Sequence, residues 1–189
     1  MSMRFFTFQS YPTSRKIAVP SAVSTQYLRS GCAMFYNHLN NLIYRASQSY
    51  RFRNIADARL QGIEMRIAAH FAAVLDVDCS LGYLSRDDRS ELLMQGIPPL
   101  SISTTTTIKL PMDVAIRHEF SYLNDRSTFR PSLSLPAVNL HHVTVSFKPV
   151  SSLMLRVRLN NLTDANYEEE LGYPAAGRAL TVGAEWSPW

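Results

Sequence analysis

The sequence predicts an all-β fold, an antiparallel transmembrane segment of about eight strands that forms part of a β-barrel. Two observations support this prediction. From Gly31 onward, apolar and polar residues alternate in successive segments, which is the two-residue period of a strand with one apolar face. The connections between these segments are long and short in turn, as in outer-membrane barrels, which have short turns at one end and long loops at the other.

The expected strands follow from this alternation. They lie at about residues 31–45, 54–71, 76–83, 102–110, 114–122, 143–148, 155–160 and 179–187. Several are rich in β-branched residues, which favour strands. Residues 1–30 carry Pro12 and Pro20 and show no sustained period. We therefore divide the chain into a poorly determined N-terminal segment, residues 1–30, and one barrel domain, residues 31–189.

Composition and motifs exclude several classes of function. The chain has 19 basic and 15 acidic residues, a formal charge of +4, but its arginines are scattered without a run or stripe, so we expect no nucleic-acid partner. No motif for a catalytic nucleophile, a metalloprotease or a nucleotide-binding loop occurs, so we expect no enzyme and no catalytic residue. The adjacent His141 and His142 point to opposite faces of a strand and cannot chelate one ion together. We expect no metal site and no cofactor.

Two stretches carry a family resemblance. The first runs from Asn54 to Glu64, and its characteristic residues are Ala58, Arg59, Gly62 and Glu64. The second follows the strand at 155–160, and its characteristic residues are Asn160, Asn161, Leu162, Asp164, Tyr167, Glu168, Gly172, Tyr173, Pro174, Gly177 and Arg178. In this order they resemble the C-terminal part of the barrel of TonB-dependent outer-membrane receptors.

The second stretch has a structural interpretation. Asn and Asp close turns by bonding to neighbouring backbone groups, and glycine adopts backbone angles closed to other residues. Tyr167 and Tyr173 suit an aromatic belt at a membrane interface. We therefore interpret these residues as markers of the fold, and the ligand-binding residues stay unknown.

The resemblance implies a fold, a location and partners. Receptors of this family form barrels of about 22 strands with a plugged lumen in the cell outer membrane, and they take up ferric siderophores, cobalamin or similar ligands with energy delivered through TonB. The implied partners are outer-membrane lipid, a TonB-type energy transducer, a siderophore or cobalamin ligand and the barrel-assembly machinery. The N-terminal residues lack the apolar core of a secretory signal, and neither a plug nor a TonB box is recognisable. We therefore expect a fragment that transports nothing by itself.

The polar strand faces of such a barrel are expected to line its lumen. The candidates for lumen-facing residues are Arg66, Arg117, Glu119, Arg156, Arg158 and Glu185. On the lipid face, arginine at the midplane costs about 2 to 4 kcal/mol, which fixes the direction of the strands. These residues either contact a plug or a substrate, or only pair with one another and with water, and the sequence leaves both interpretations open.

Two other architectures fit the same alternation. The first is a small eight-stranded outer-membrane barrel with a structural or channel role, which closes by pairing its first and last strands. The second is a soluble β-barrel or sandwich that binds a ligand and buries its apolar faces in one core.

Overall fold

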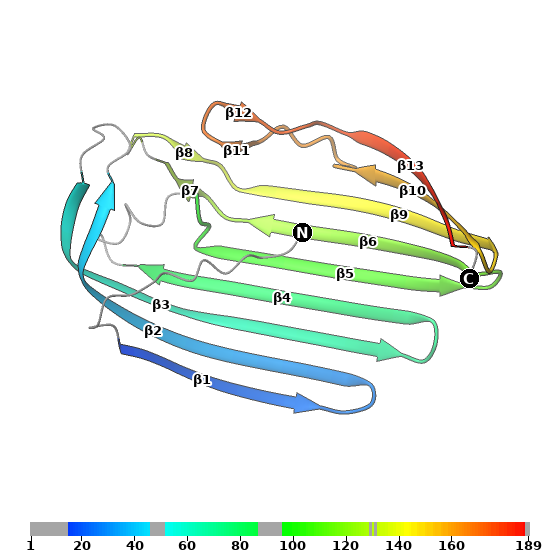
Figure 1. The fold of residues 1–189 in the computed structure, drawn as a ribbon, viewed down its shortest axis with the longest axis horizontal. Coiled ribbons are helices and arrows are strands. Elements are labelled where there is room, and N and C mark those ends of the chain that lie inside the picture. The colour runs from blue at the N-terminus through cyan, green and yellow to red at the C-terminus, as the bar shows by residue number, and fades with distance from the viewer. Residues whose placement is uncertain (1–14, 46–51, 87–95, 129, 131, 188–189) are drawn as a thin grey trace.

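Nine antiparallel strands form one large curved sheet (Figure 1). The computed structural model describes residues 15–45, 52–86, 96–128, 130 and 132–187. The nine strands lie side by side in chain order and are β1 (Arg15–Ser24), β2 (Leu28–Arg45), β3 (Phe52–Phe71), β4 (Leu75–Arg86), β5 (Leu100–Leu110), β6 (Val114–Leu123), β9 (Val138–Val150), β10 (Leu153–Asn160) and β13 (Ala179–Trp186). The predicted all-β antiparallel fold is confirmed. None of the described residues forms a helix that is long and apolar enough to cross a membrane.

Eight of the nine strands are those expected from the alternation, and β1 is the addition. It lies within residues 1–30, where the sequence shows no regular period, and it contains Pro20, which faces Ala33 of β2. Proline lacks an N–H donor, and in the described sheet β1 pairs with β2 alone. The second strand also begins earlier than expected, at Leu28 rather than Gly31.

The connections have the predicted rhythm. Residues 25–27, 72–74, 111–113 and 151–152 make the short turns, which gather at one end of the sheet, on the right in Figure 1. The connections from β4 to β5, β6 to β9 and β10 to β13 are longer, and the strand ends that lead into them lie at the other end. Met112 and Asp113 both have positive φ, 64° and 54°, as a type I′ hairpin turn requires.

Two of the long connections contain small hairpins that the sequence did not predict. The β6–β9 connection pairs β7 (Arg126–Ser127) with β8 (Ser134–Leu135). The β10–β13 connection pairs β11 (Glu168–Glu170) with β12 (Tyr173–Pro174). The three buried apolar residues among those described, Leu135, Val138 and Leu140, lie at this end of the sheet. The closest packing is therefore between loops and strand ends.

The sheet itself is a single layer with two chemically different faces. Strand register carries the apolar face across neighbours, for example from Met65 to Leu81 to Ile102 and from Val157 to Val145. Many of these side chains are open to the surroundings, among them Met65 at 43% and Val157 at 43% exposure. No second sheet covers this face within the described ranges, so the alternative of a soluble β-barrel or sandwich with one core does not agree with this structure.

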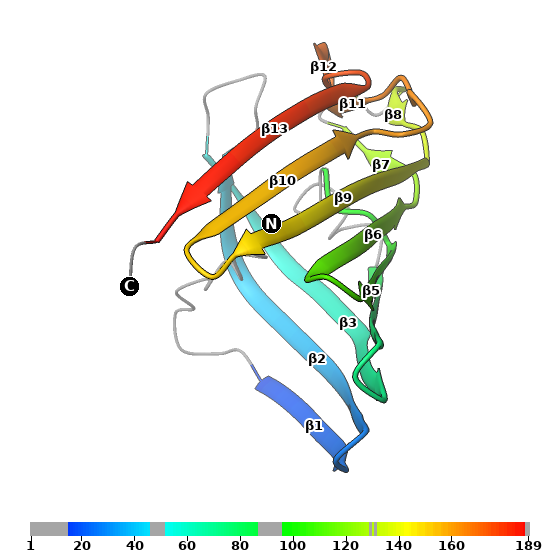
Figure 2. The same cartoon turned by 90° about the vertical axis from the view of Figure 1, so that its right-hand side faces the viewer.

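The sheet is also open. Figure 2 shows β1 and β13 at opposite ends of the curve, and in the described chain β1 pairs with β2 while β13 pairs with β10. Because neighbouring strands alternate in direction and there are nine, β1 and β13 run the same way, and joining them would require parallel pairing. The alternative of a small self-closing antiparallel barrel therefore does not agree with this structure.

Candidate functional site

The six predicted lumen-facing residues all lie on the polar face of the sheet. Residues paired across antiparallel strands share a face, and one such row crosses seven strands: His70, Asp76, Thr107, Arg117, Thr144, Arg158 and Thr181. Each of the other four candidates lies an even number of residues from the member of this row on its own strand, so its side chain points to the same side. These four are Arg66, Glu119, Arg156 and Glu185.

Five of these six residues are paired with one another or with a neighbouring aspartate. An Arg66 guanidinium nitrogen lies 2.9 Å from Asp78, Arg156 lies 3.3 Å from Glu185, and Arg158 lies 2.6 Å from Glu119. Arg66 and Arg156 are more than half exposed, so their pairs stabilise the fold by at most about 1 kcal/mol each. The pairs chiefly make a charged surface with little net charge.

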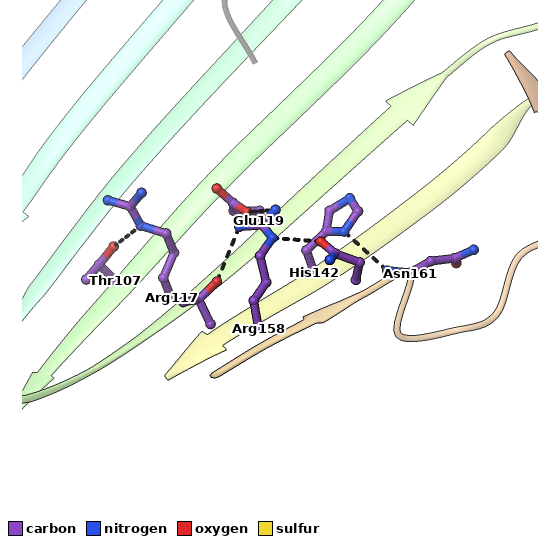
Figure 3. Close-up of polar contacts among 8 residues, drawn as sticks. Thr107, Arg117, Glu119, His142, Arg158 and Asn161 are labelled. Atoms are coloured by element: carbon purple, nitrogen blue, oxygen red, sulfur yellow. Dashed lines mark hydrogen bonds and ion pairs between the residues drawn. The ribbon is translucent and has the colours of Figure 1, made fainter. Parts of the chain in front are cut away.

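Arg158 is the centre of the polar network in Figure 3. Its Nε donates to the Asn160 side chain at 2.7 Å and its Nη1 to the Thr144 hydroxyl at 3.3 Å, while Nη2 reaches over β9 to Glu119 on β6. The Glu119 contact is short, but its angle is outside hydrogen-bonding geometry, so it acts as an ion pair. The network ties three strands together on one face.

Arg117 differs from the other cations of this face. Its one recorded contact is a long hydrogen bond, 3.4 Å from Nε to the Thr107 hydroxyl, and no carboxylate of the described residues pairs with it (Figure 3). A planar guanidinium presents two donors side by side to carboxylate or phosphate oxygens. Arg117 is therefore the residue of this face best suited to bind an anionic group.

The second family stretch forms a clasp at the long-loop end of β10. Asn161, only 3% exposed and with φ of 48°, holds the clasp together. Its side chain accepts a hydrogen bond from the Ala165 N–H at 2.8 Å and donates to the carbonyls of Ala165, at 2.8 Å, and Ala176, at 3.4 Å. Its own N–H donates to Nδ1 of His142, which links the clasp to β9 (Figure 3).

Asp164 closes the other side of this clasp. Its carboxylate accepts the Arg178 N–H at 2.7 Å and lies 3.7 Å from the Arg178 guanidinium. A side chain at Gly177 would begin 3.0 Å from the same carboxylate oxygen, so glycine gives Asp164 room to reach the backbone. Leu162 adds a backbone hydrogen bond to the His141 carbonyl at 2.8 Å. These contacts have the turn-closing role that the sequence predicts for Asn and Asp.

The remaining residues of the second stretch form the hairpin. Glu168 accepts the N–H of Gly172, whose φ is 84°, and pairs with Pro174 across the hairpin. Tyr167 and Tyr173 lie in this connection, beyond the end of β10, and Tyr173 is 70% exposed. Among the residues whose side chains are described, Tyr36, Tyr83 and Tyr122 lie on the apolar face toward the long-loop end.

Arg126 anchors the hairpin, and the sequence analysis missed it. It is 7% exposed and donates to the backbone carbonyls of Glu168, at 2.8 Å, and Glu169, at 3.2 Å. Because both acceptors are main-chain atoms more than 40 residues away, no side-chain pattern in the sequence signals this contact. Burial raises the pKa of the neighbouring Tyr167 hydroxyl, the Glu169 carboxylate raises it further, and the charge of Arg126 opposes both effects.

The first family stretch is explained mainly by Gly62. A Cβ at this position would lie 2.6 Å from the ring of Phe35 and 2.6 Å from the Tyr83 carbonyl oxygen. Glycine therefore allows the ring of Phe35 to cover the backbone of β3. Glu64 and Arg59 are exposed on β3, and Ala58 lies in a part of β3 of which only the backbone is described.

The comparisons with known proteins agree with this architecture. Residues 28–162 match the family of TonB dependent receptor-like β-barrels. The chain belongs to this family. Its membership accounts for the continuous antiparallel sheet and for the placing of long connections at one end.

Solved receptors of similar fold come from several bacteria. The siderophore receptor PiuA from Acinetobacter baumannii matches with a TM-score of 0.73 at 16% identity, over 92% of this chain and 28% of that one. The copper transporter OprC matches with a TM-score of 0.77 at 15% identity, over 92% and 31%. The ferripyoverdine receptor of the outer membrane of Pseudomonas aeruginosa matches with a TM-score of 0.70 at 17% identity, over 92% and 26%.

At these identities the likeness shows the fold. The chain spans less than a third of the length of each of these receptors. The described residues contain no group of three or more His, Cys, Asp or Glu side chains arranged to hold a metal ion. His141 and His142 point to opposite faces, as expected, because their partners on β6 are Phe120 and Glu119.

Proposed function

We propose that this chain forms part of the barrel wall of a TonB-dependent receptor in the outer membrane, which imports a ferric siderophore, cobalamin or a similar scarce ligand. One observation carries the proposal. The nine-stranded sheet has one mainly apolar face, an opposite face on which most of the described charges are paired, and its short turns gathered at one end. A wall between lipid and a polar lumen needs all three features.

The polar face is the lumen side under this proposal. Arg66, Arg156 and Arg158 then sit in a solvated interior with their carboxylate partners, where their charge costs little. The long connections face outward from the cell, and the apolar face contacts lipid. A TonB-type transducer, the imported ligand and the barrel-assembly machinery are partners of the whole receptor.

The open edges support a role as part of a larger barrel rather than an independent one. Hydrocarbon does not tolerate unpaired backbone groups, so β1 and β13 each require another strand. Since both edges run in the same direction, an antiparallel barrel is completed by an odd number of additional strands. Residues 31–189, together with β1, are then one section of a single barrel domain, and transport requires the completed barrel.

Cysteine labelling of the receptor in outer-membrane fragments tests the orientation. We would replace Cys32 and Cys79 by serine and introduce a cysteine at Arg117 or, as a matched control on the opposite face, at Ile116. A charged maleimide that does not enter hydrocarbon is expected to label Arg117→Cys and to leave Ile116→Cys unlabelled. The reverse pattern, or equal labelling of both, contradicts the proposed orientation.

Gene deletion in the source bacterium tests the transport role. The deletion strain and a complemented strain would receive radioactive iron bound to the siderophores of their own spent medium, labelled cobalamin or labelled copper, in separate assays. Uptake of one cargo is expected to fall after deletion and to return on complementation. The proposal is overturned if deletion leaves the uptake of all three cargoes unchanged and the chain is absent from the outer-membrane fraction of the complemented strain.

A further inference from the structure

The apolar face is hollowed where β2, β3 and β4 lie side by side, toward the long-loop end of the sheet. The hollow has a volume of about 340 Å³. Its lining side chains on this face form two rows across the three strands, Met34–Ile63–Tyr83 and Tyr36–Gln61–Ser85, and Phe35 and Gly62 also line it. Tyr36 and Tyr83 flank β3 and are 36% and 48% exposed. The hollow is therefore a groove along β3 between two tyrosines.

The groove lies at the outer surface of the membrane if the proposed function, on which this inference rests, is correct. A strand of about 9 to 11 residues crosses the bilayer. Counted from Phe71 at the short turn, Ile63 is the ninth residue of β3 and Gln61 the eleventh. On β4, counted from Leu75, Tyr83 is the ninth. Tyrosine rings favour the zone where hydrocarbon meets headgroups, and the groove lies in this zone.

A cationic side chain lies at the outer end of this groove. Arg59 is exposed and comes two residues beyond Gln61 on the same face, about 7 Å further along β3. His38 of β2 is its partner in the strand register. A guanidinium has five N–H donors, so Arg59 can bind two phosphate oxygens side by side and also contact a neighbouring side chain. From the middle of the membrane outward, this surface is therefore apolar, then hydroxyl- and amide-bearing, then cationic.

We propose that this groove binds one anionic lipid of the outer leaflet, with an acyl chain between Tyr36 and Tyr83 and a headgroup phosphate at Arg59. Such a lipid has its groups in the same order as the groove: hydrocarbon, then ester or amide linkages, then an anion. The Gln61 amide and the Ser85 hydroxyl are paired across β3 and β4 at the level of the linkages, where both can donate hydrogen bonds to them. Charge complementarity with Arg59 favours a phosphate whose headgroup carries no cation of its own.

Photocrosslinking of the receptor in the outer membrane of its source bacterium tests the site. The photoreactive phenylalanine analogue benzoylphenylalanine would replace Tyr83 in the groove or, as a matched control, Tyr122, which lies outside it on the same face and is likewise the ninth residue of its strand. Mass spectrometry of the crosslinked peptides is expected to show a phosphate-bearing lipid at Tyr83 and about tenfold less at Tyr122. Equal lipid crosslinking at both positions, or a crosslink from Tyr83 to protein alone, overturns the site. No lipid crosslink at either position contradicts the proposed function as well.

Substitution of Arg59 tests the phosphate contact in the purified receptor. Nanodiscs would contain equal amounts of phosphatidylglycerol, which is anionic, and phosphatidylcholine, which is not, and native mass spectrometry after transfer to detergent would count the lipids that stay bound. The wild type is expected to retain phosphatidylglycerol preferentially, and Arg59→Gln should reduce this preference about tenfold. Arg66→Gln, on the same strand but on the polar face, is the control and should keep it. Equal retention of both lipids by the wild type, or an unchanged preference in Arg59→Gln, overturns the phosphate contact. Labelling of Arg117→Cys and not of Ile116→Cys would then leave the proposed orientation standing.

Discussion

Replacing Asn161 by alanine should open the clasp between β10 and β13. The side chain of Asn161 makes three hydrogen bonds, to the N–H and C=O of Ala165 and to the carbonyl of Ala176, and it is almost fully buried. Each buried backbone group that loses its partner costs about 1 to 3 kcal/mol. The positive φ of 48° adds roughly 1 kcal/mol, because alanine adopts the left-handed region less readily than asparagine. We expect the clasp to lose about 3 kcal/mol or more.

Hydrogen exchange on the receptor in detergent measures this loss. The reporters are the amides of Leu162 and Arg178, whose own acceptors, the His141 carbonyl and the Asp164 carboxylate, are unchanged by the substitution. About 3 kcal/mol corresponds to roughly a hundredfold faster exchange.

A second substitution at the same position divides the effect into its causes. Asn161→Gly removes the same hydrogen bonds but tolerates positive φ, so it should exchange about fivefold more slowly than the alanine variant and still much faster than the wild type. Wild-type exchange in the alanine variant would refute the role of the side chain. Full protection in the glycine variant would show that the backbone angle alone matters.

Three further predictions concern other parts of the sheet and its loops. Gly62→Ala should strain β3 by about 1 to 3 kcal/mol and so lower the midpoint of thermal unfolding, measured as the loss of the folded band on electrophoresis. Gly183→Ala is the control, because no atom lies within 4 Å of a Cβ added there, and its midpoint should not change. Equal midpoints for the two variants contradict the packing argument. Arg126→Lys should expose the β11–β12 hairpin to protease, because an ammonium cannot replace the two-carbonyl contact; an uncut hairpin contradicts this. Burial raises the pKa of the Tyr167 hydroxyl in the folded protein. The contribution of Tyr167 to the free energy of unfolding is therefore complete below the ordinary tyrosine pKa, and it is lost as pH rises through the higher pKa of the folded state. Protease cutting of the hairpin should therefore increase at alkaline pH, and Tyr167→Phe should abolish that increase; the same pH profile in both proteins contradicts it.

The strands were predictable because a sheet with one apolar face imposes a two-residue period on its sequence. On β10, for example, the alternation predicts opposite faces for Val157 and Arg158, and the strand register places them there. β1 escaped prediction because its sequence, with Pro20 near the middle, shows no sustained alternation. The small hairpins escaped because strands of two or three residues are too short to show a period.

The contacts across the sheet were not predictable. The alternation along β6 predicts that His118 lies on the apolar face, but its contact with His141 depends on the register between β6 and β9, which a long connection separates. Arg126 binds main-chain carbonyls, which have no residue type to recognise. The sequence of one strand predicts the face on which each of its residues lies. Predicting the neighbour of a residue on the next strand also requires the register between the two strands.

Strand register also gives the second family stretch a structural role. The connection after Asn160 must bring the chain back beside β10 so that Ala179, the first residue of β13, pairs with Asn160. A slip of one residue in this register would move every side chain of β13 to the other face. Leu180 and Val182 would then enter the polar face and Glu185 the apolar one. The Asn161 hydrogen bonds fix the start of the connection, and the bond from the Arg178 N–H to Asp164 fixes its end one residue before β13 begins. These residues are thus required by the geometry of the last strand.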